Sequence, residues 1–120
     1  MVTTINSGAV SMDARTVRTT REMLGLNQPE FARLVGVSPR SVAGWERGER
    51  ISDTGERLLR QARDLAEQLA GLAESPAALG EWLTAPNDYF DGLKPLEVVE
   101  RGQVSRLLRF LYRLEAGEPG

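Results

Sequence analysis

The sequence contains neither cysteine nor histidine among its 120 residues. Without cysteine there is no disulfide framework and no thiol chemistry, which is consistent with a reducing compartment. Without histidine the commonest metal ligand and general base is missing. No run of about 18 apolar residues occurs, so no segment is predicted to span a membrane. We therefore expect a cytoplasmic protein that contacts no membrane.

Carboxylates are the remaining candidates for catalysis, and their distribution argues against an enzyme. Glu81, Asp88 and Asp91 are scattered, and none has a basic or nucleophilic partner at a plausible spacing. The sequence also has no phosphate-binding loop. We predict no catalytic residue, no metal site and no cofactor.

Charge is divided unevenly along the chain, and almost all of the positive charge comes from arginine. Residues 11–60 carry nine Arg and seven Asp or Glu, whereas residues 61–120 carry six basic and ten acidic side chains. The imbalance is compatible with an ordinary solvated surface. It also suits a protein whose two halves meet different partners.

Helix signals dominate, and no stretch shows the sustained alternation of a strand. The first dozen residues lack the basic flank and apolar run of a secretory signal, and we expect residues 1–12 to be flexible. The apolar periodicity, with glycine and proline as breaks, predicts an all-α protein with helices over residues 13–25, 27–35, 38–48, 53–74, 75–85, 95–101 and 103–115. We divide the chain into two helical units, one over residues 13–74 and a second over residues 75–120.

The predicted helix over residues 53–74 carries more apolar positions than a small three-helix core can use. They approach a heptad seam, and comprise Leu58, Leu59, Ala62, Leu65, Ala66, Leu69 and Leu72. Asp53 and Glu56 have the spacing of a capping box at its start. We expect the surplus seam to pack on the C-terminal half or on a second subunit, which favours a homodimer.

The stretch from Ser38 to Gly48 is the clearest structural signal. Val42 and Trp45 are spaced to anchor one side of a short helix, and the preceding helix, with an Asn27–Glu30 capping pair, ends at Gly36. Two short helices joined by a tight glycine turn indicate a helix-turn-helix. The start of the second helix is then free to enter the DNA major groove.

The stretch GLNQPEFARLVGVSPRSVAGWERGER resembles the Xre/Cro-repressor helix-turn-helix. The shared features are Gln28, Ala32, Gly36-Val37 and Trp45-Glu46-x-Gly48. The resemblance implies that Gln28 holds a phosphate and that the first turns of the third helix read bases. With Arg47 added, the DNA-binding set is Gln28, Ser38, Pro39, Arg40, Ser41, Gly44 and Arg47.

Two of these residues also have simpler interpretations, in which Gln28 only caps its helix and Arg40 is a solvated surface side chain. Arg40 is the only long donor at the base-reading positions, and Gly44 stands where the family often has a long polar reader. We expect modest base specificity, supported by dimerisation and by contacts between arginine and phosphate. For Glu46 we expect local pairing or the orientation of a backbone amide.

Residues 75–120 are too few to form a well-buried core alone, so this unit must lean on the long helix or on a partner. Its sequence resembles the toxin-binding domain of Xre/MbcA/ParS-type antitoxins, through Trp82, Pro86-Asn87, Phe90, Gly92, Pro95-x-Glu97-Val98-Val99 and Gly102. One departure is Lys94, where the family often has a small hydroxyl residue that would cap the next helix.

This resemblance implies an antitoxin of a type II toxin–antitoxin system. The implied partners are a cognate toxin, most often a RES-domain enzyme that consumes NAD, and operator DNA, in a larger toxin–antitoxin assembly. The last helix and tail would cover the toxin's active site, and the complex would repress its own promoter. The toxin-contact candidates are Trp82, Asn87, Tyr89, Phe90, Arg106, Arg109, Arg113, Leu114, Glu115 and Glu118.

An alternative function remains open at this point. The chain could be a stand-alone Xre-family repressor whose C-terminal half only dimerises or senses a ligand. In that case the arginines of the last helix are a solvated face, and Trp82, Tyr89 and Phe90 form the core of a small domain.

Overall fold

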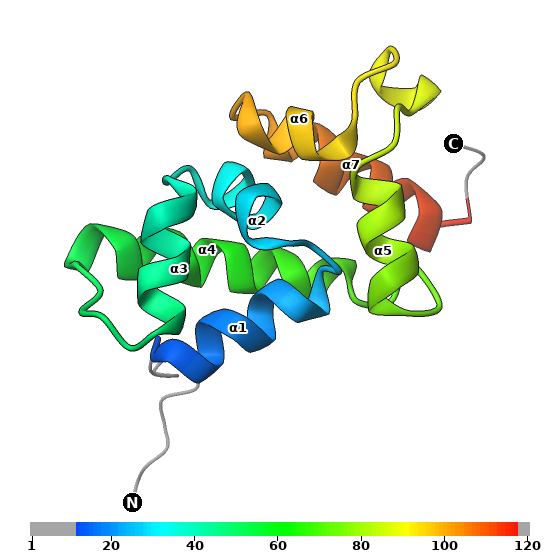
Figure 1. Cartoon of the computed structure of the whole chain (residues 1–120). Helices are drawn as coiled ribbons and strands as arrows, with labels where there is room; N and C mark the ends of the chain where they lie inside the picture. Colours follow the sequence, from blue (N-terminus) through cyan, green and yellow to red (C-terminus); the bar gives the residue numbers. More distant parts are fainter. Residues whose placement is uncertain (1–11, 118–120) are drawn as a thin grey trace, which may run out of the picture.

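The computed structural model describes residues 12–117, which form seven α-helices and one 3-10 turn and contain no strand (Figure 1). The predicted all-α fold is therefore confirmed. The elements are α1 (Ala14–Met23), α2 (Gln28–Val35), α3 (Pro39–Glu46), α4 (Asp53–Leu69), α5 (Pro76–Leu83), η2 (Asp88–Phe90), α6 (Pro95–Glu100) and α7 (Val104–Glu115).

The first helices begin at polar caps that the sequence marks. The Asp13 side chain accepts a hydrogen bond from the backbone of Thr16 at the start of α1. Asn27 and Glu30 form the predicted capping box of α2, with N–H···O distances of 2.8 and 3.0 Å. Such caps satisfy backbone N–H groups that have no partner within the helix. Of the predicted flexible segment, residue 12 is a buried methionine, and residues 1–11 lie outside the described chain.

Helix α4 differs from its prediction at both ends. Its N-cap is Ser52, whose side chain accepts from the backbone N–H of Gly55, and not Asp53. The helix ends at Leu69 and not near residue 74. Gly71 explains the early end, because glycine costs a helix about 1 kcal/mol relative to alanine. The chain then turns, and Leu72 folds back against the core.

The loop between α5 and α6 is closed by Asn87. Its side chain accepts a hydrogen bond from the backbone N–H of Tyr89 at 2.8 Å, and its own N–H donates to the carbonyl of Leu93 at 3.0 Å. Asp91 then takes a left-handed conformation, with φ of 59°. At Lys94 no side-chain cap forms, as expected, but the Glu97 carboxylate accepts from the Lys94 backbone N–H at 2.9 Å.

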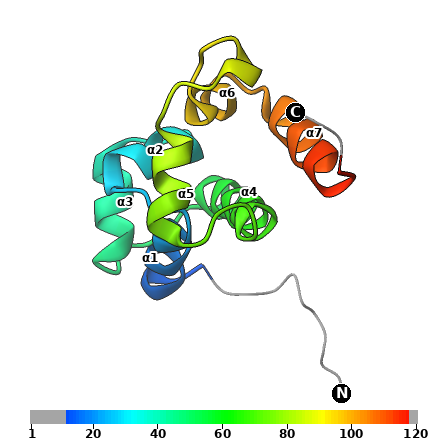
Figure 2. The same cartoon turned by 90° about the vertical axis from the view of Figure 1, so that its right-hand side faces the viewer.

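The two halves of the chain share a single hydrophobic core. In Figure 2, α4 lies between the group of α1 to α3 and the C-terminal helix α7. The core is continuous from the first half to the second, and its fully buried side chains include Val17, Phe31, Leu59, Leu69, Leu79, Leu83, Phe90, Leu96 and Leu107. Residues 75–117 therefore lean on the helix-turn-helix half, as their small size predicts.

One close contact between the halves is a crossing of backbone on backbone. A Cβ added to Gly80 of α5 would overlap the carbonyl oxygen of Gly25 and lie 2.8 Å from its carbonyl carbon. A Cβ added to Gly25 would in turn overlap the carbonyl oxygen of Pro76. Gly25 also has a positive φ of 66°, which favours glycine. Helix α5 is thus seated directly on the turn between α1 and α2.

We expect Gly80→Ala to lower the free energy of unfolding by about 1–3 kcal/mol, the usual range for overpacking a close contact. The direction is informative, because alanine is the better helix former by about 1 kcal/mol. Gly71→Ala is the matched control, since nothing lies within 4 Å of its added Cβ. Urea unfolding of both variants would measure the difference, and a Gly80→Ala protein as stable as wild type would contradict the close crossing.

Candidate nucleic-acid interface and partner-binding surface

Helices α2 and α3 form the helix-turn-helix that the sequence predicts. Gly36 ends α2 in the left-handed conformation, with φ of 93°, and its N–H donates to the carbonyl of Ala32 at 2.8 Å. Val42 is fully buried and Trp45 is 8% exposed, so α3 is anchored from behind. The opposite face of α3 is open to a ligand.

The predicted base-reading residues gather at the start of α3. Ser38, Pro39 and Arg40 are exposed, and Ser41 is half-buried. The Ser38 side chain accepts from the backbone N–H of Ser41 at 3.1 Å, and the two hydroxyl oxygens lie 3.0 Å apart. The Arg40 guanidinium makes no hydrogen bond or ion pair with any residue between 12 and 117, so its donors are available to a ligand.

The predicted reading position at Gly44 is not open. Gly44 is buried, because the side chain of Glu49 lies over it. Glu49 also forms an ion pair of 2.9 Å with Arg47, another residue of the predicted DNA-binding set. The surface at this position is therefore made by Glu49, which the sequence analysis did not select.

A buried carboxylate behind α3 holds the helix-turn-helix together. Glu46 has a side chain only 4% exposed. It accepts two hydrogen bonds from the Arg21 guanidinium, at 2.7 and 2.9 Å, and one from the Gln28 amide at 3.1 Å. Arg18 donates to the Glu46 backbone carbonyl at 3.1 Å. One carboxylate thus links α1, α2 and α3.

The expectation of local pairing for Glu46 is wrong, because its partners are 18 or more residues away in sequence. The hydrogen bonds from Arg21, followed by the one from Gln28, hold the pKa of Glu46 below its ordinary value despite burial. The same pair raises the pKa of Arg21. The sequence signal was present, since Arg18 and Arg21 are three residues apart and share one face of α1.

The placement of Gln28 is compatible with its predicted contact to phosphate. It is the first residue of α2 and is half-buried, and the hydrogen bond to Glu46 fixes the orientation of its amide. The N-terminus of a helix favours anions, because its backbone N–H groups and its dipole both point outward. The phosphate contact itself stays a prediction.

The second surface is built on an aromatic cluster between α5, η2 and α7. Phe110 stacks on Trp82 with ring centroids 5.7 Å apart, and it contacts Tyr89 at 4.7 Å and Phe90 at 5.6 Å. Phe90 is fully buried, which corrects its predicted role: it supports the surface from within and cannot touch a partner. Trp82 and Tyr89 are half-buried.

Phe110 is not among the predicted toxin-contact residues, because its partners Trp82, Tyr89 and Phe90 are 20 or more residues away in sequence. Asn87, another predicted toxin contact, stabilises its own loop, because its side-chain oxygen accepts a hydrogen bond from the backbone N–H of Tyr89. Half-buried Arg106 is also engaged within the chain, through Gln103 at 2.9 Å and Asp91 at 3.4 Å, and it lies 5.8 Å from the centre of the Phe90 ring.

The outer face of α7 carries the rest of the predicted toxin-contact set. Leu107 and Leu111 are buried, whereas Val104 and Leu114 are exposed by 37% and 41%. Around them stand the exposed side chains of Arg109, Tyr112, Arg113 and Glu115. Arg113 reaches the Tyr89 hydroxyl at 3.4 Å. Glu118 lies outside the described residues.

The two surfaces lie on opposite sides of the molecule. Helix α3 is at the left and α7 at the right in both views of the chain (Figures 1 and 2). A ligand on α3 and a partner on the outer face of α7 can therefore be held at the same time.

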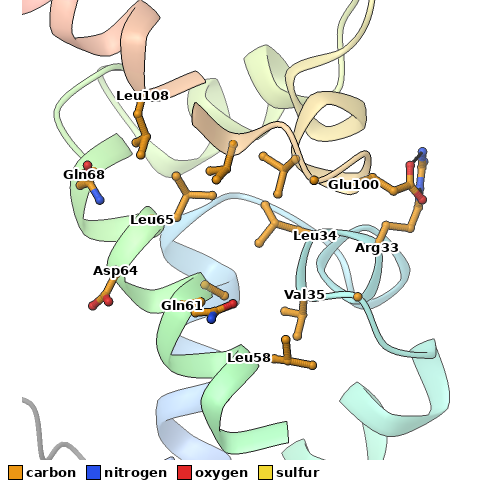
Figure 3. Close-up of a pocket in the computed structure, with 15 residues that line it drawn as sticks. Arg33, Leu34, Val35, Leu58, Gln61, Asp64, Leu65, Gln68, Glu100 and Leu108 are labelled. Carbon is orange, nitrogen blue, oxygen red and sulfur yellow. Dashed lines mark hydrogen bonds and ion pairs between the residues drawn. The ribbon is translucent and has the colours of Figure 1, made fainter. Parts of the chain in front are cut away.

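A groove of about 570 Å³ runs between α4 and the C-terminal helices (Figure 3). Leu34, Leu65 and Leu108 line it, and the exposed ion pair of Arg33 and Glu100, at 2.7 Å, stands at its rim. Most of the apolar seam of α4 is buried within the chain, with Leu58 and Leu72 only partly covered. The helices that lie closest to α4 are α1 and α2 of the first half, whereas Leu65 of α4 and Leu108 of α7 face each other only across the groove. Packing of the surplus seam on the C-terminal half or on a second subunit therefore stays a prediction.

Within residues 12–117, two features that would indicate other functions are absent. No group of three or more acidic side chains is placed to hold a metal ion. None of the helices in this range has the length and apolar character needed to cross a membrane.

Comparison with known proteins assigns both halves. Residues 17–63 match the helix-turn-helix family HTH_3. The mycobacterial cidal antitoxin MbcA of Mycobacterium bovis and of Mycobacterium tuberculosis is 32% identical over 108 residues, which cover 90% of this chain and 96% of the relative. A chain in the crystal structure of the M. tuberculosis MbcT-MbcA toxin-antitoxin complex matches with a TM-score of 0.71 and 29% identity, over 90% of this chain and 97% of the other.

The fold and these likenesses define a helix-turn-helix protein of the antitoxin class. More particularly, the chain belongs to the family of the mycobacterial cidal antitoxin MbcA.

Proposed function

We propose that this antitoxin neutralises a cognate toxin through the outer face of α7 and represses its own promoter through α3. The observation that carries the proposal is the likeness to MbcA, which extends through both halves of the chain. The solved relative is one component of a toxin-antitoxin complex. The opposite placement of α3 and α7 suits a protein with two partners.

The toxin we propose is a RES-domain enzyme that consumes NAD. This follows from the resemblance of residues 78–114 to the toxin-binding domain of Xre/MbcA/ParS-type antitoxins. The outer face of α7 exposes Arg109, Tyr112 and Leu114. This composition is typical of a binding hot spot, because aromatic and arginine side chains dominate such sites. Arginines here would pair with carboxylates of the toxin's cleft.

The test is rescue of growth when the antitoxin is co-expressed with the protein encoded by the neighbouring reading frame, which we expect to be a RES-domain enzyme. Deletion of α7 is a poor test, because Leu107 and Leu111 belong to the core. We expect the double variant Arg109→Glu/Leu114→Glu to lose rescue, since both side chains are exposed and contribute nothing to the core. Arg57→Glu, on the exposed side of α4, is a charge-reversal control away from α7 and should rescue as wild type does. Rescue by the double variant would exclude this face as the inhibitory element.

For DNA we propose that Arg40 reads a base edge while Gln28 contacts a phosphate, and that Arg47, paired with Glu49, lies at the edge of the same surface. Arginine pairs best with the O6 and N7 atoms of guanine. The start of α3, where Ser38, Pro39 and Ser41 surround Arg40, is the part of a recognition helix that contacts bases. The charge of residues 11–60, with nine Arg against seven acidic side chains, favours this half for the nucleic acid.

We expect Arg40→Ala to weaken binding to the promoter by about 1–3 kcal/mol at fixed salt, with specificity relaxed at one base pair. The fold should not change, because the Arg40 side chain is exposed and unpaired within residues 12–117. Titration of the labelled promoter fragment by the full chain would measure the affinity. Equal affinities for wild type and variant would remove α3 as the reading element.

We further propose that the chain acts as a homodimer within a larger assembly with its toxin. Helix-turn-helix proteins commonly bind paired half-sites, which requires two recognition helices. Size-exclusion chromatography with light scattering, on the chain alone and with its toxin, tests both statements, and a monomer bound to a single half-site would contradict them.

A further inference from the structure

On the solvent-facing side of α3, the proposed base-reading position Gly44 has no side chain, and a residue that follows the helix covers it. Arg40, Gly44 and Arg47 are spaced i, i+4 and i+7, so they share one face. That face is opposite Val42 and Trp45, which are buried. Gly44 is the one of these three residues without a side chain. It is buried although it lies on the solvent-facing side of the helix, so another residue must cover it.

Glu49 is the residue that covers Gly44. A Cβ at position 44 would overlap the Oε1 atom of Glu49 and lie 2.9 Å from its carboxyl carbon. The Glu49 carboxylate therefore occupies the space into which a side chain at position 44 would project. Its own side chain remains 63% exposed, so the carboxylate faces solvent on the open side of α3.

Two further contacts hold the carboxylate in this place. The backbone N–H of Glu49 donates to the carbonyl of Gly44 at 2.9 Å, which fixes the chain directly after the helix. The Arg47 guanidinium donates to Glu49 Oε2 at 2.9 Å. One carboxylate oxygen is thus engaged by Arg47, while Oε1 lies against Gly44.

We propose that Glu49 is a base-reading residue of the recognition surface, taking the position that Gly44 leaves vacant. This rests on the proposed binding of DNA by α3. A carboxylate is an acceptor without donors, so it pairs with the N4 amino group of cytosine in the major groove. Against guanine O6 or thymine O4 it sets acceptor against acceptor, which rejects those bases.

The same carboxylate tunes the general affinity for DNA. A negative charge close to the phosphates opposes binding to every sequence, and its ion pair with Arg47 occupies a cation that would otherwise contact a phosphate. Glu49 therefore lowers the affinity for DNA of any sequence and raises the discrimination between bases at one position. This compensates for a recognition helix with only one long donor, Arg40.

Selection of binding sites from a random duplex library by the full-length protein tests the proposal. Four proteins are compared: wild type, Glu49→Ala, Glu49→Gln and Arg40→Ala. Wild type should enrich a motif with one cytosine position that Arg40→Ala retains. Glu49→Ala should lower the preference for that cytosine by about tenfold, and Glu49→Gln should shift it toward adenine, which glutamine recognises.

A second readout separates base reading from electrostatics. Binding of Glu49→Ala to an unrelated duplex should be tighter than that of wild type, with a salt dependence steeper by about one phosphate contact because Arg47 is released. Unchanged base preferences at every position in both Glu49 variants, with the Arg40 position lost in Arg40→Ala, would overturn this inference alone. Failure of wild type to enrich any motif would overturn both this inference and the proposed DNA binding.

Discussion

Replacement of Glu46 by alanine is expected to lower the free energy of unfolding by about 3–5 kcal/mol, because it leaves the Arg21 charge without its partner in a mostly buried site. Arg21 has a side chain only 18% exposed, so water can repay little of the lost interaction. The change also frees the amide of Gln28 and removes a side chain that joins α3 to α1 and α2. The total free energy of unfolding of a small domain is only about 5–15 kcal/mol, so this loss is a large part of it.

Chemical denaturation at neutral pH measures this loss, and Glu49→Ala is its control. Glu49 also pairs with an arginine, but both side chains are more than 60% exposed, so we expect a change within about 0.5 kcal/mol. A Glu46→Ala protein no less stable than this control would show that the cluster is not a stabilising one.

The contribution of Glu46 should also depend on pH. Its pKa in the folded chain is below the ordinary value, so unfolding raises the affinity of this carboxylate for a proton. The stabilisation is therefore complete above about pH 4.3, the usual value for an unfolded Glu, and is lost as the pH falls through the lower folded value. The difference in stability between wild type and Glu46→Gln should shrink steadily as the pH falls below the usual Glu value toward the lower folded one.

Phe90→Ala is expected to be as damaging, at about 3–5 kcal/mol, the usual cost of removing a buried phenylalanine. Phe90 is fully buried and supports the rings of Tyr89 and Phe110 at 5.2 and 5.6 Å. Loss of its ring leaves a cavity beneath the surface that we propose for the toxin. The variant should therefore also fail to neutralise the toxin, although Phe90 itself touches no partner.

Thermal and urea unfolding would quantify this effect, with Tyr112→Ala as the control. Tyr112 is also an aromatic residue of the C-terminal half, but it is 70% exposed, so we expect little change in stability. Because the halves share one core and the close crossing of Gly25 and Gly80, Phe90→Ala should unfold in a single transition. If the C-terminal half unfolded in a separate transition, the two halves would not share one cooperative core.

The helices themselves were largely predictable, because their ends are encoded locally. Asn27 caps α2 as the sequence predicts, and Ser38 and Ser75, the first residues of their predicted ranges, cap α3 and α5. The errors concern α4, where Ser52 and Asp53 are adjacent polar candidates for the cap and where apolar periodicity continues past Gly71. Periodicity records which side would face a core, and it does not reveal where the chain turns away from it.

The sites were less predictable, because they depend on distances across the fold. The sequence does not bring Glu46 to Arg21, nor Phe110 to Trp82, since each pair is more than 20 residues apart. Glu49 follows the recognition helix and carries no motif, so only the three-dimensional structure places it over Gly44. The proposed DNA-binding and toxin-contact residues remain predictions, apart from Phe90, which burial removes.

The close crossing of Gly80 on Gly25 opposes a hinge motion between the two halves of this antitoxin. A protein that can swivel between its two ends adapts to operators of different half-site separation, at an entropic cost each time it binds. A chain locked at its midpoint has no such latitude, so the way that two copies associate would dictate the separation at which they bind. The half-site separation in the promoter would then have to match the fixed distance between the two recognition helices. Insertion of one base pair between the half-sites would lower the affinity for the promoter.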